Sequence, residues 1–286
     1  MQDVRNWVSS PLGHHILLGM FKETGGMMDF FLKKYVSLNK KPEFTVSSKL
    51  FLTPNNPLQQ YLQDLKSINE VECPRDAALH WVKNHKVVND DSLTKNVPAS
   101  AQLVVLNAST FKSTWAKTNG NSLMKIYNSF SYTQDINYEA RILELPLRDQ
   151  DFKMIVIAPN DVDLLHTLFR RLSHDGLKAA ICNIQPLFTV KSKLIAPDIQ
   201  FTSEETMEEN IGQLGAVTIS QLGDAKVSAD GAQFSMLSYL YIKWFIKKPS
   251  EEEAITVKKQ PFFFSLVYQD TPIYTGQFNY ISQPCH

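Results

Sequence analysis

The alternation of apolar and polar residues predicts a chain in which β-strands dominate. The strongest candidate lies in "AQLVVLNASTFKSTW", where residues 103–106 are apolar at every position and suit a central strand covered on both faces. "YEARILELPL" and "FKMIVIAP" predict a hairpin whose turn is "RDQD". Towards the end of the chain, "SYLYIKWFI" and "FFFSLVY" are rich in aromatic and β-branched residues, which favour strands.

Helical periodicity marks several segments between these strands. Pro11 opens a helix whose apolar residues recur on one face, and "NNP" starts a second one. Residues 75–88 and 162–181 are amphipathic in the same way. "SEETMEENIGQLG", residues 203–215, is predicted to be a helix with a capping box and a glycine stop.

Composition supports a globular domain with a balanced surface charge. Of the 286 residues, 43% are hydrophobic, and Lys+Arg and Asp+Glu number 29 each. This balance gives no electrostatic reason to expect a nucleic acid or a membrane as partner, and no apolar run approaches the roughly 20 residues of a membrane span. Since no repeat, low-complexity tract or linker interrupts the pattern, we expect one α+β domain over residues 1–286.

No motif with chemistry of its own is evident, so an enzyme is not expected. The sequence lacks a GxSxG elbow, a phosphate-binding glycine loop and an HExxH helix. His14 and His15 are adjacent and would point apart on a helix, whereas His80 and His85 have a poor spacing for one metal ion. We therefore expect no catalytic residue, no cofactor and no metal site.

The cysteines and the first residues leave the compartment open. Cys73, Cys182 and Cys285 make neither a CxxC motif nor a metal-ligand spacing, so we expect unpaired thiols, with one disulfide as the alternative in a secreted protein. The opening "MQDVRNWVSSPLG" lacks the apolar centre of a signal peptide, which leaves a cytosolic chain or one whose leader is removed. Asn107 begins a sequon but falls inside the predicted central strand, so we expect it to be unglycosylated.

Four segments carry motifs that occur in the same order in one known family. "NWVSSPL" resembles N-[VI]-x-x-SP-[LV], and "LVVLNASTFKSTW" resembles LVLVNAIYFKGxW. "LELPLRDQDFKMIVIAP" resembles LELPYxGxxxSMxIxLP, and "QPFFFSLVYQDTPIYTGQF" resembles PFLFxIxxxxxxxILFMGxV. On these motifs the chain is similar to the serpin family, and its shortened form most resembles the reduced serpins of insects such as mosquitoes.

The resemblance implies an α+β serpin fold with three β-sheets, a reduced helical layer and a reactive loop before the C-terminal strands. In inhibitory members this loop is bait, and after cleavage it inserts into the main sheet and drags the acylated protease across the molecule. We expect the family's first helix to be absent, because nothing before Asn6 resembles it. We also expect the fourth helix to be absent, because only residues 37–43 precede the strand at Phe44. Heparin binding through that helix is therefore not expected.

The stretch "KKPSEEEAITVKKQPFFF" corresponds to the reactive loop and departs from the family. From Ser250 to Pro261 it can reach only about 37 Å, whereas crossing a sheet takes roughly 50 Å. Its three glutamates replace the family's small hinge residues, and inserting them would bury a carboxylate. Pro249 cannot donate to a sheet ladder. The remnant of the loop comprises Ser250, Glu251, Glu252, Glu253, Ala254, Ile255, Thr256, Val257, Lys258 and Lys259.

Residues that control sheet opening in the family are partly matched. Ser10 and Asn107 match the family's serine and asparagine, while Gly13 stands where a second serine is usual. The family's histidine in "HKA" has no counterpart in "YIKWFI". Lys112 and Trp115 match the pair at the top of the sheet where insertion begins, although Trp115 is equally well interpreted as a core aromatic.

These departures predict a serpin-fold protein that has lost suicide-substrate inhibition of serine proteases and acts as a non-inhibitory binding or scaffold protein. The alternative is a reversible serine protease inhibitor that uses Lys258 or Lys259 as bait. The partner would be an unidentified protein or small ligand, and we expect a monomer. The family favours an extracellular location, and a cytoplasmic one stays open.

Overall fold

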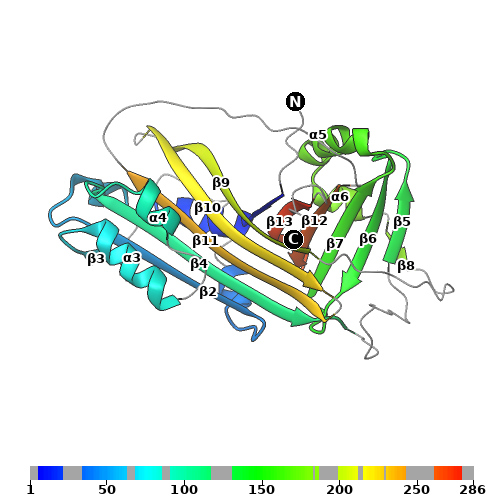
Figure 1. Ribbon diagram of the computed structural model, residues 1–286, viewed down its shortest axis with the longest axis horizontal. Coiled ribbons are helices and arrows are strands. Elements are labelled where there is room, and N and C mark those ends of the chain that lie inside the picture. The colour runs from blue at the N-terminus through cyan, green and yellow to red at the C-terminus, as the bar shows by residue number, and fades with distance from the viewer. Residues whose placement is uncertain are drawn as a thin grey trace, which may run out of the picture.

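The computed structural model consists of two β-sheets that share an apolar core, with short helices on their outer faces (Figure 1). The structure describes residues 6–21, 34–62, 68–85, 91–116, 131–182, 184–186, 199–211, 215–228, 230–242 and 261–278.

One sheet has seven strands in the order β1-β13-β12-β7-β6-β5-β8, and every neighbouring pair is antiparallel. The strands are β1 (Trp7–Ser9), β13 (Thr271–Phe278), β12 (Phe262–Tyr268), β7 (Phe152–Pro159), β6 (Ala140–Pro146), β5 (Ser131–Asp135) and β8 (Gln185–Pro186). β6 and β7 form the predicted hairpin, and β12 lies where the run "FFFSLVY" predicts a strand.

The main sheet has six strands in the order β3-β2-β4-β11-β10-β9. These are β3 (Ile68–Glu70), β2 (Phe44–Leu52), β4 (Leu103–Thr114), β11 (Gly231–Ile242), β10 (Gly215–Ser228) and β9 (Ile199–Ile211). Only β2 and β3 are parallel. β4 is central, as predicted, and residues 103–106 are fully buried because helices cover one face of the sheet and the second sheet covers the other.

Short helices cover the sheets where apolar faces would otherwise meet water. They are α1 (Pro11–Leu18), η1 (Pro57–Tyr61), α3 (Pro74–His85), α4 (Asp91–Asn96), η2 (Val162–Leu164), α5 (Leu165–Asp175) and α6 (Leu177–Ile181). α1 lies between the sheets, against β4, β11 and β13, while α3 packs on the opposite face of β4 and β2. None of the described helices is long and apolar enough to cross a membrane.

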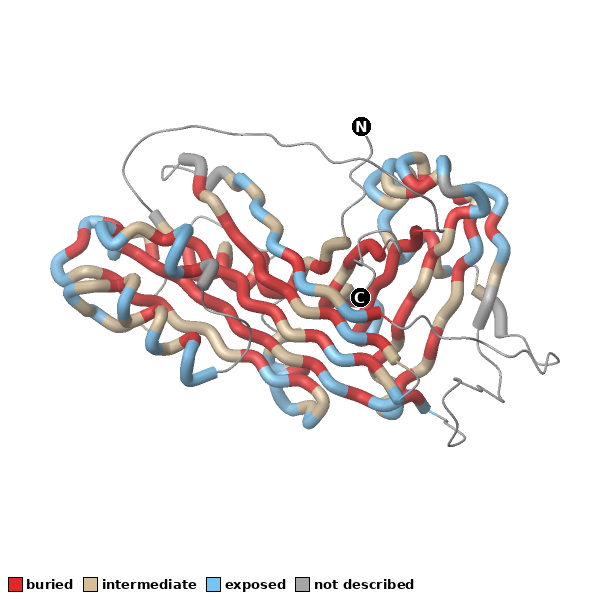
Figure 2. Tube along the Cα trace, in the orientation of Figure 1, coloured by how far each residue is buried: buried red, intermediate tan, exposed pale blue. Residues whose placement is uncertain are grey.

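Aromatic side chains hold the two sheets together. Phe234 of β11 stacks on Phe264 of β12, with ring centroids 5.9 Å apart, and on Tyr274 of β13, at 5.2 Å. Phe111 of β4 contacts both Phe234 and Phe152 of β7. Such pairs add a specific attraction to the burial of large apolar surfaces. Figure 2 shows buried residues along most of β4, β11 and β10, so this part of the main sheet is interior.

The helix predicted over residues 203–215 is wrong, because this segment is strand β9 followed by the start of β10. β9 pairs with β10 along its whole length, from Ile199 with Val227 to Ile211 with Gly215. The glutamates favour a helix locally, but pairing with a neighbouring strand satisfies the backbone and overrides that preference.

The helical layer is thin in the way the resemblance implies. Residues 34–38 are helical, and the chain then passes through a turn directly into β2, so no helix lies between residues 39 and 43. The expected absence of the family's first helix concerns the segment before residue 6, which lies outside the described residues. A third sheet is not found among the strands that the structure describes.

Candidate functional site

Strand β11 fills the centre of the main sheet. Each of its residues pairs with β4 on one side, and on the other side Ser228 of β10 pairs directly with Gly231. At the tight start of the strand a Cβ on Gly231 would lie 2.1 Å from the backbone oxygen of Ser113, so only glycine fits there. β11 starts at Gly231, seven residues before the predicted strand segment "SYLYIKWFI". The last four residues of that segment, 243–246, lie outside the described residues.

Both faces of β11 carry large apolar side chains. Phe234, Met236 and Leu240 face the core between the sheets, whereas Leu237 and Tyr239 face the core beneath α3 and α4. All five have 0% exposed surface. Such a pattern is typical of a strand in a sheet that is covered on both faces.

A largely buried polar cluster crosses the main sheet on the face that carries α1. It consists of Ser10, Ser48, Asn107, Gln221 and Ser238, and we call it the polar cluster. Ser10 caps α1, because its Oγ accepts a hydrogen bond from the backbone nitrogen of Gly13 at 2.9 Å. The same hydroxyl donates to the backbone oxygen of Ile273 on β13 at 3.1 Å. Ser10 is thus a structural residue that joins α1 to the second sheet.

Gln221 on β10 is the centre of the polar cluster. Its Oε1 accepts from the backbone nitrogen of Ser10 at 2.9 Å and from the hydroxyl of Ser9 at 2.7 Å. Its Nε2 donates to the backbone oxygen of Ser10 at 3.0 Å and to the hydroxyl of Ser238 on β11 at 2.9 Å. All four amide hydrogen bonds are made, so this side chain ties β10 and β11 to the start of α1.

Sequence reasoning missed Gln221, although a signal was present. In "AVTISQLGDAKV" it occupies the same alternating face as Ile219 and Val227, both fully buried. A polar residue on the buried face of a strand needs partners, which marks it as a candidate for a polar network.

Asn107, the other residue that matches the family, lies on β4 in the polar cluster. The Nδ2 of Asn107 donates to Ser48 of β2 at 2.8 Å, and its buried Oδ1 has no hydrogen-bond partner in the described part of the chain. At Gly13, which replaces the family's second serine, a Cβ would lie 2.7 Å from Ser238 Oγ and 3.1 Å from Asn107 Oδ1. Helix α1 thus packs more closely against the sheet than a serine at this position would permit.

His14 brings a titratable group to the edge of the polar cluster. Its Nε2 lies 3.1 Å from a carboxylate oxygen of Glu209 on β9. Burial lowers the pKa of His14, and the attraction of Glu209 offsets only part of that effect. His15 also has a lowered pKa, caused first by burial and then by repulsion from His14.

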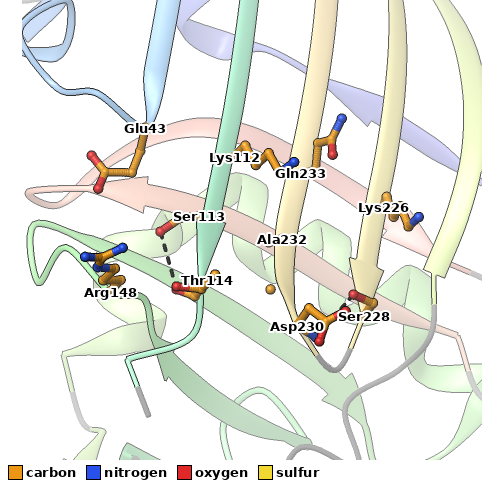
Figure 3. Close-up of a pocket in the computed structure, with 11 residues that line it drawn as sticks. Glu43, Lys112, Ser113, Thr114, Arg148, Lys226, Ser228, Asp230, Ala232 and Gln233 are labelled. Carbon is orange, nitrogen blue, oxygen red and sulfur yellow. Dashed lines mark hydrogen bonds between the residues drawn. The ribbon is translucent and has the colours of Figure 1, made fainter. Parts of the chain in front are cut away.

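Lys112 and Trp115, which match the family's pair at the site where loop insertion begins, both lie at the end of the main sheet where β11 begins. Trp115 is buried, and its Nε1 donates to the backbone oxygen of Ser228 at 2.9 Å, so it is a core aromatic that also fixes the end of β10. Lys112 is exposed and lines a cavity of about 510 Å³ at this end (Figure 3). The predicted loop remnant, residues 250–259, lies outside the described residues.

No family model matches the chain, but curated relatives do. Human Serpin B3 is 25% identical over 264 residues, which are 80% of this chain and 67% of that protein. Human Serpin B4 is 26% identical over 72% of this chain and 61% of that protein. The leukocyte elastase inhibitor of Xenopus laevis is 25% identical over 68% of this chain and 58% of that protein. The chain thus spans about two thirds or less of the length of these relatives.

Solved structures with similar folds cover nearly all of the chain. "Cleaved Serpin 42Da" has a TM-score of 0.69 at 18% identity and covers 97% of this chain and 92% of its own. The thermophilic serpin Tengpin in the latent state has a TM-score of 0.66 at 14% identity, covering 98% and 93%. A loop-inserted structure of a cleaved ovalbumin mutant has a TM-score of 0.62 at 13% identity, covering 97% and 94%. An insect origin and a shortened form stay predictions. The chain has the serpin fold, and the curated proteins that it resembles in sequence are serpins or serpin-type inhibitors.

Proposed function

We propose that this protein is a non-inhibitory serpin-fold protein whose main sheet is already complete, and that it acts by binding a partner. The observation that carries the proposal is the position of β11, which pairs with β4 on one side and β10 on the other. The family's inhibitory mechanism requires a loop that enters the main sheet after cleavage. A sheet that already contains its own central strand offers that loop no place between β4 and β10.

The free energy gained by burying the apolar side chains of β11 supports this proposal. Withdrawing the strand would expose Phe234, Met236, Leu237, Tyr239 and Leu240, which are all fully buried. At about 2 kcal/mol for each large apolar side chain, the loss is about 10 kcal/mol. That equals the whole stability of many domains, about 5–15 kcal/mol. An intact protein with β11 outside the sheet would therefore be too unstable to serve as the metastable state from which an inhibitory serpin releases its strain.

The chemistry of β11 also differs from that of a strand built to insert. The family hinge resembles EEGTEAAAAT, whose small residues can slide between strands, whereas "GAQFSMLSYLYI" carries bulky side chains on both faces. Several solved neighbours are described as cleaved, latent or loop-inserted. Their similarity is consistent with a filled sheet as the resting state of this protein.

The test is covalent trapping of a protease. The protein is incubated with trypsin at several ratios, next to an inhibitory serpin that traps trypsin, and the products are separated on a denaturing gel. We expect cleavage products only. A band at the summed mass of the two proteins that disappears in hydroxide would identify an acyl-enzyme complex and overturn the proposal.

The same experiment separates the alternative of reversible inhibition. Loss of amidase activity without a covalent band, removed by Lys258→Ala with Lys259→Ala, would favour a reversible inhibitor over a binding protein. We further propose a monomer, and the resemblance favours an extracellular location.

A further inference from the structure

A cavity of about 510 Å³ lies at the end of the main sheet where β4 and β10 end and β11 begins (Figure 3). Its volume is in the range of sites that hold small molecules, about 300–1,000 Å³. Its walls combine the open face of the sheet with Arg148, which follows β6, and Glu43, which precedes β2.

Three polar side chains form a row across the floor of the cavity. Lys112 of β4 is the register partner of Gln233 of β11, and Gln233 is the register partner of Lys226 of β10. All three are exposed, and register partners on neighbouring strands project from the same face of a sheet. Since strands lie about 4.8 Å apart, the two lysine backbones are about 10 Å apart, within reach of a common anion by their flexible stems.

The cations of this cavity form no ion pair with any carboxylate among the described residues. Lys112, Lys226 and Arg148 make no ion pair within the part of the chain that the structure describes, whereas Lys41 lies 2.7 Å from Asp149. The backbone nitrogen of Arg148 donates to the backbone oxygen of Thr114 at 2.9 Å, which holds this residue at the rim. Cations that line a hollow without an ion pair among the described residues attract an anion.

Glu43 supplies an independent requirement on the ligand. Its Oε2 is buried and has no hydrogen-bond partner among the residues that the structure describes, although Glu43 lines the cavity. Its backbone oxygen accepts from the backbone nitrogen of Lys112 at 2.9 Å, so the backbones of these two lining residues lie side by side. A buried acceptor without a donor is costly, and a hydroxyl group on the ligand would satisfy it. The other carboxylate at the cavity, Asp230, is exposed at the start of β11.

We propose that this cavity binds a small polyvalent anion that carries a hydroxyl group. Lys112, Lys226 and Arg148 would hold its anionic groups, the Gln233 amide would donate between the two lysines, and the ligand's hydroxyl would donate to Glu43. This inference does not depend on whether the protein inhibits proteases.

The test compares two probes that differ by one hydroxyl group. Citrate and tricarballylate have the same three carboxylates, and only citrate has the hydroxyl. Titration calorimetry at constant ionic strength should show citrate binding, with tricarballylate about fivefold weaker because one hydrogen bond is missing. Lys112→Gln combined with Lys226→Gln should weaken citrate at least about tenfold, because two charge-assisted contacts are lost.

The matched control is Lys49→Gln, which removes a lysine on β2 that lies outside the cavity lining. This control should leave citrate affinity unchanged within about twofold, since it removes the same charge without a contact. Melting curves establish that each variant is folded, and Lys226→Gln alone replaces the double variant if that one is not. Absence of citrate binding at about 10 mM, an equal loss in the control, or equal affinity for the two probes would overturn the proposal.

Discussion

Gln221→Leu should be among the most damaging conservative substitutions in the main sheet. Leucine keeps much of the volume of glutamine but removes all four amide hydrogen bonds. The backbone nitrogen of Ser10 and the hydroxyl of Ser238 would lose the hydrogen bonds that Gln221 makes with them, in a place where Gln221 itself has 0% exposed surface. The backbone oxygen of Ser10 would still accept a hydrogen bond from the backbone nitrogen of His14 at 3.0 Å.

The structure sets the expected magnitude. Each buried polar group left without a partner costs about 1–3 kcal/mol, and two such groups, the backbone nitrogen of Ser10 and the hydroxyl of Ser238, would be left so. We therefore expect the free energy of unfolding to fall by about 2–6 kcal/mol. The matched control is Gln233→Leu, the same change at an exposed position on the neighbouring strand, which should cost under about 0.5 kcal/mol.

The assay is urea unfolding followed by both tryptophan fluorescence and far-ultraviolet circular dichroism, so that any intermediate becomes visible as a difference between the two curves. A loss for Gln221→Leu no larger than that for Gln233→Leu would refute the account of the polar cluster.

Two further predictions concern α1. Gly13→Ala should lower the free energy of unfolding by about 1–3 kcal/mol, because the new Cβ would meet Ser238 Oγ at 2.7 Å; urea unfolding measures this, and an unchanged midpoint would contradict the close packing of the helix. His14 has a pKa lowered by burial, so the unfolded chain takes up the proton first and stability should decline as the pH falls below the ordinary value of 6.5. His14→Gln should flatten this decline between pH 7 and pH 5 in unfolding titrations, and an equally steep decline in the variant would assign it to other groups.

Local patterns predicted the elements whose residues interact with near neighbours. The unbroken apolar run of β4, the hairpin of β6 and β7, and the proline at the start of α1 each indicate a structure without knowledge of the rest of the chain. The role of Ser10 as the N-cap of α1 was not predicted, although a serine before a proline-initiated helix is a local signal for it.

Features that depend on distant residues were missed. The glutamates of β9 predict a helix, and only the pairing with β10 makes the segment a strand. The partner of Ser10 in the polar cluster, Gln221, lies 211 positions away in the sequence, and no local pattern indicates such a contact. The insertion of β11 between β4 and β10 is likewise a property of the whole sheet and not of the segment itself.

The central claim, that β11 is already part of the main sheet in the intact protein, is tested most directly by hydrogen exchange. The uncut chain and the chain cleaved by trypsin are compared by mass spectrometry, with β4 (Leu103–Thr114) as the internal reference for a central strand. The account predicts that the amides of β11 (Gly231–Ile242) are as protected as those of β4 before cleavage and gain no protection after it. Rapid exchange of β11 in the uncut protein, followed by protection once the chain is cleaved, would contradict it.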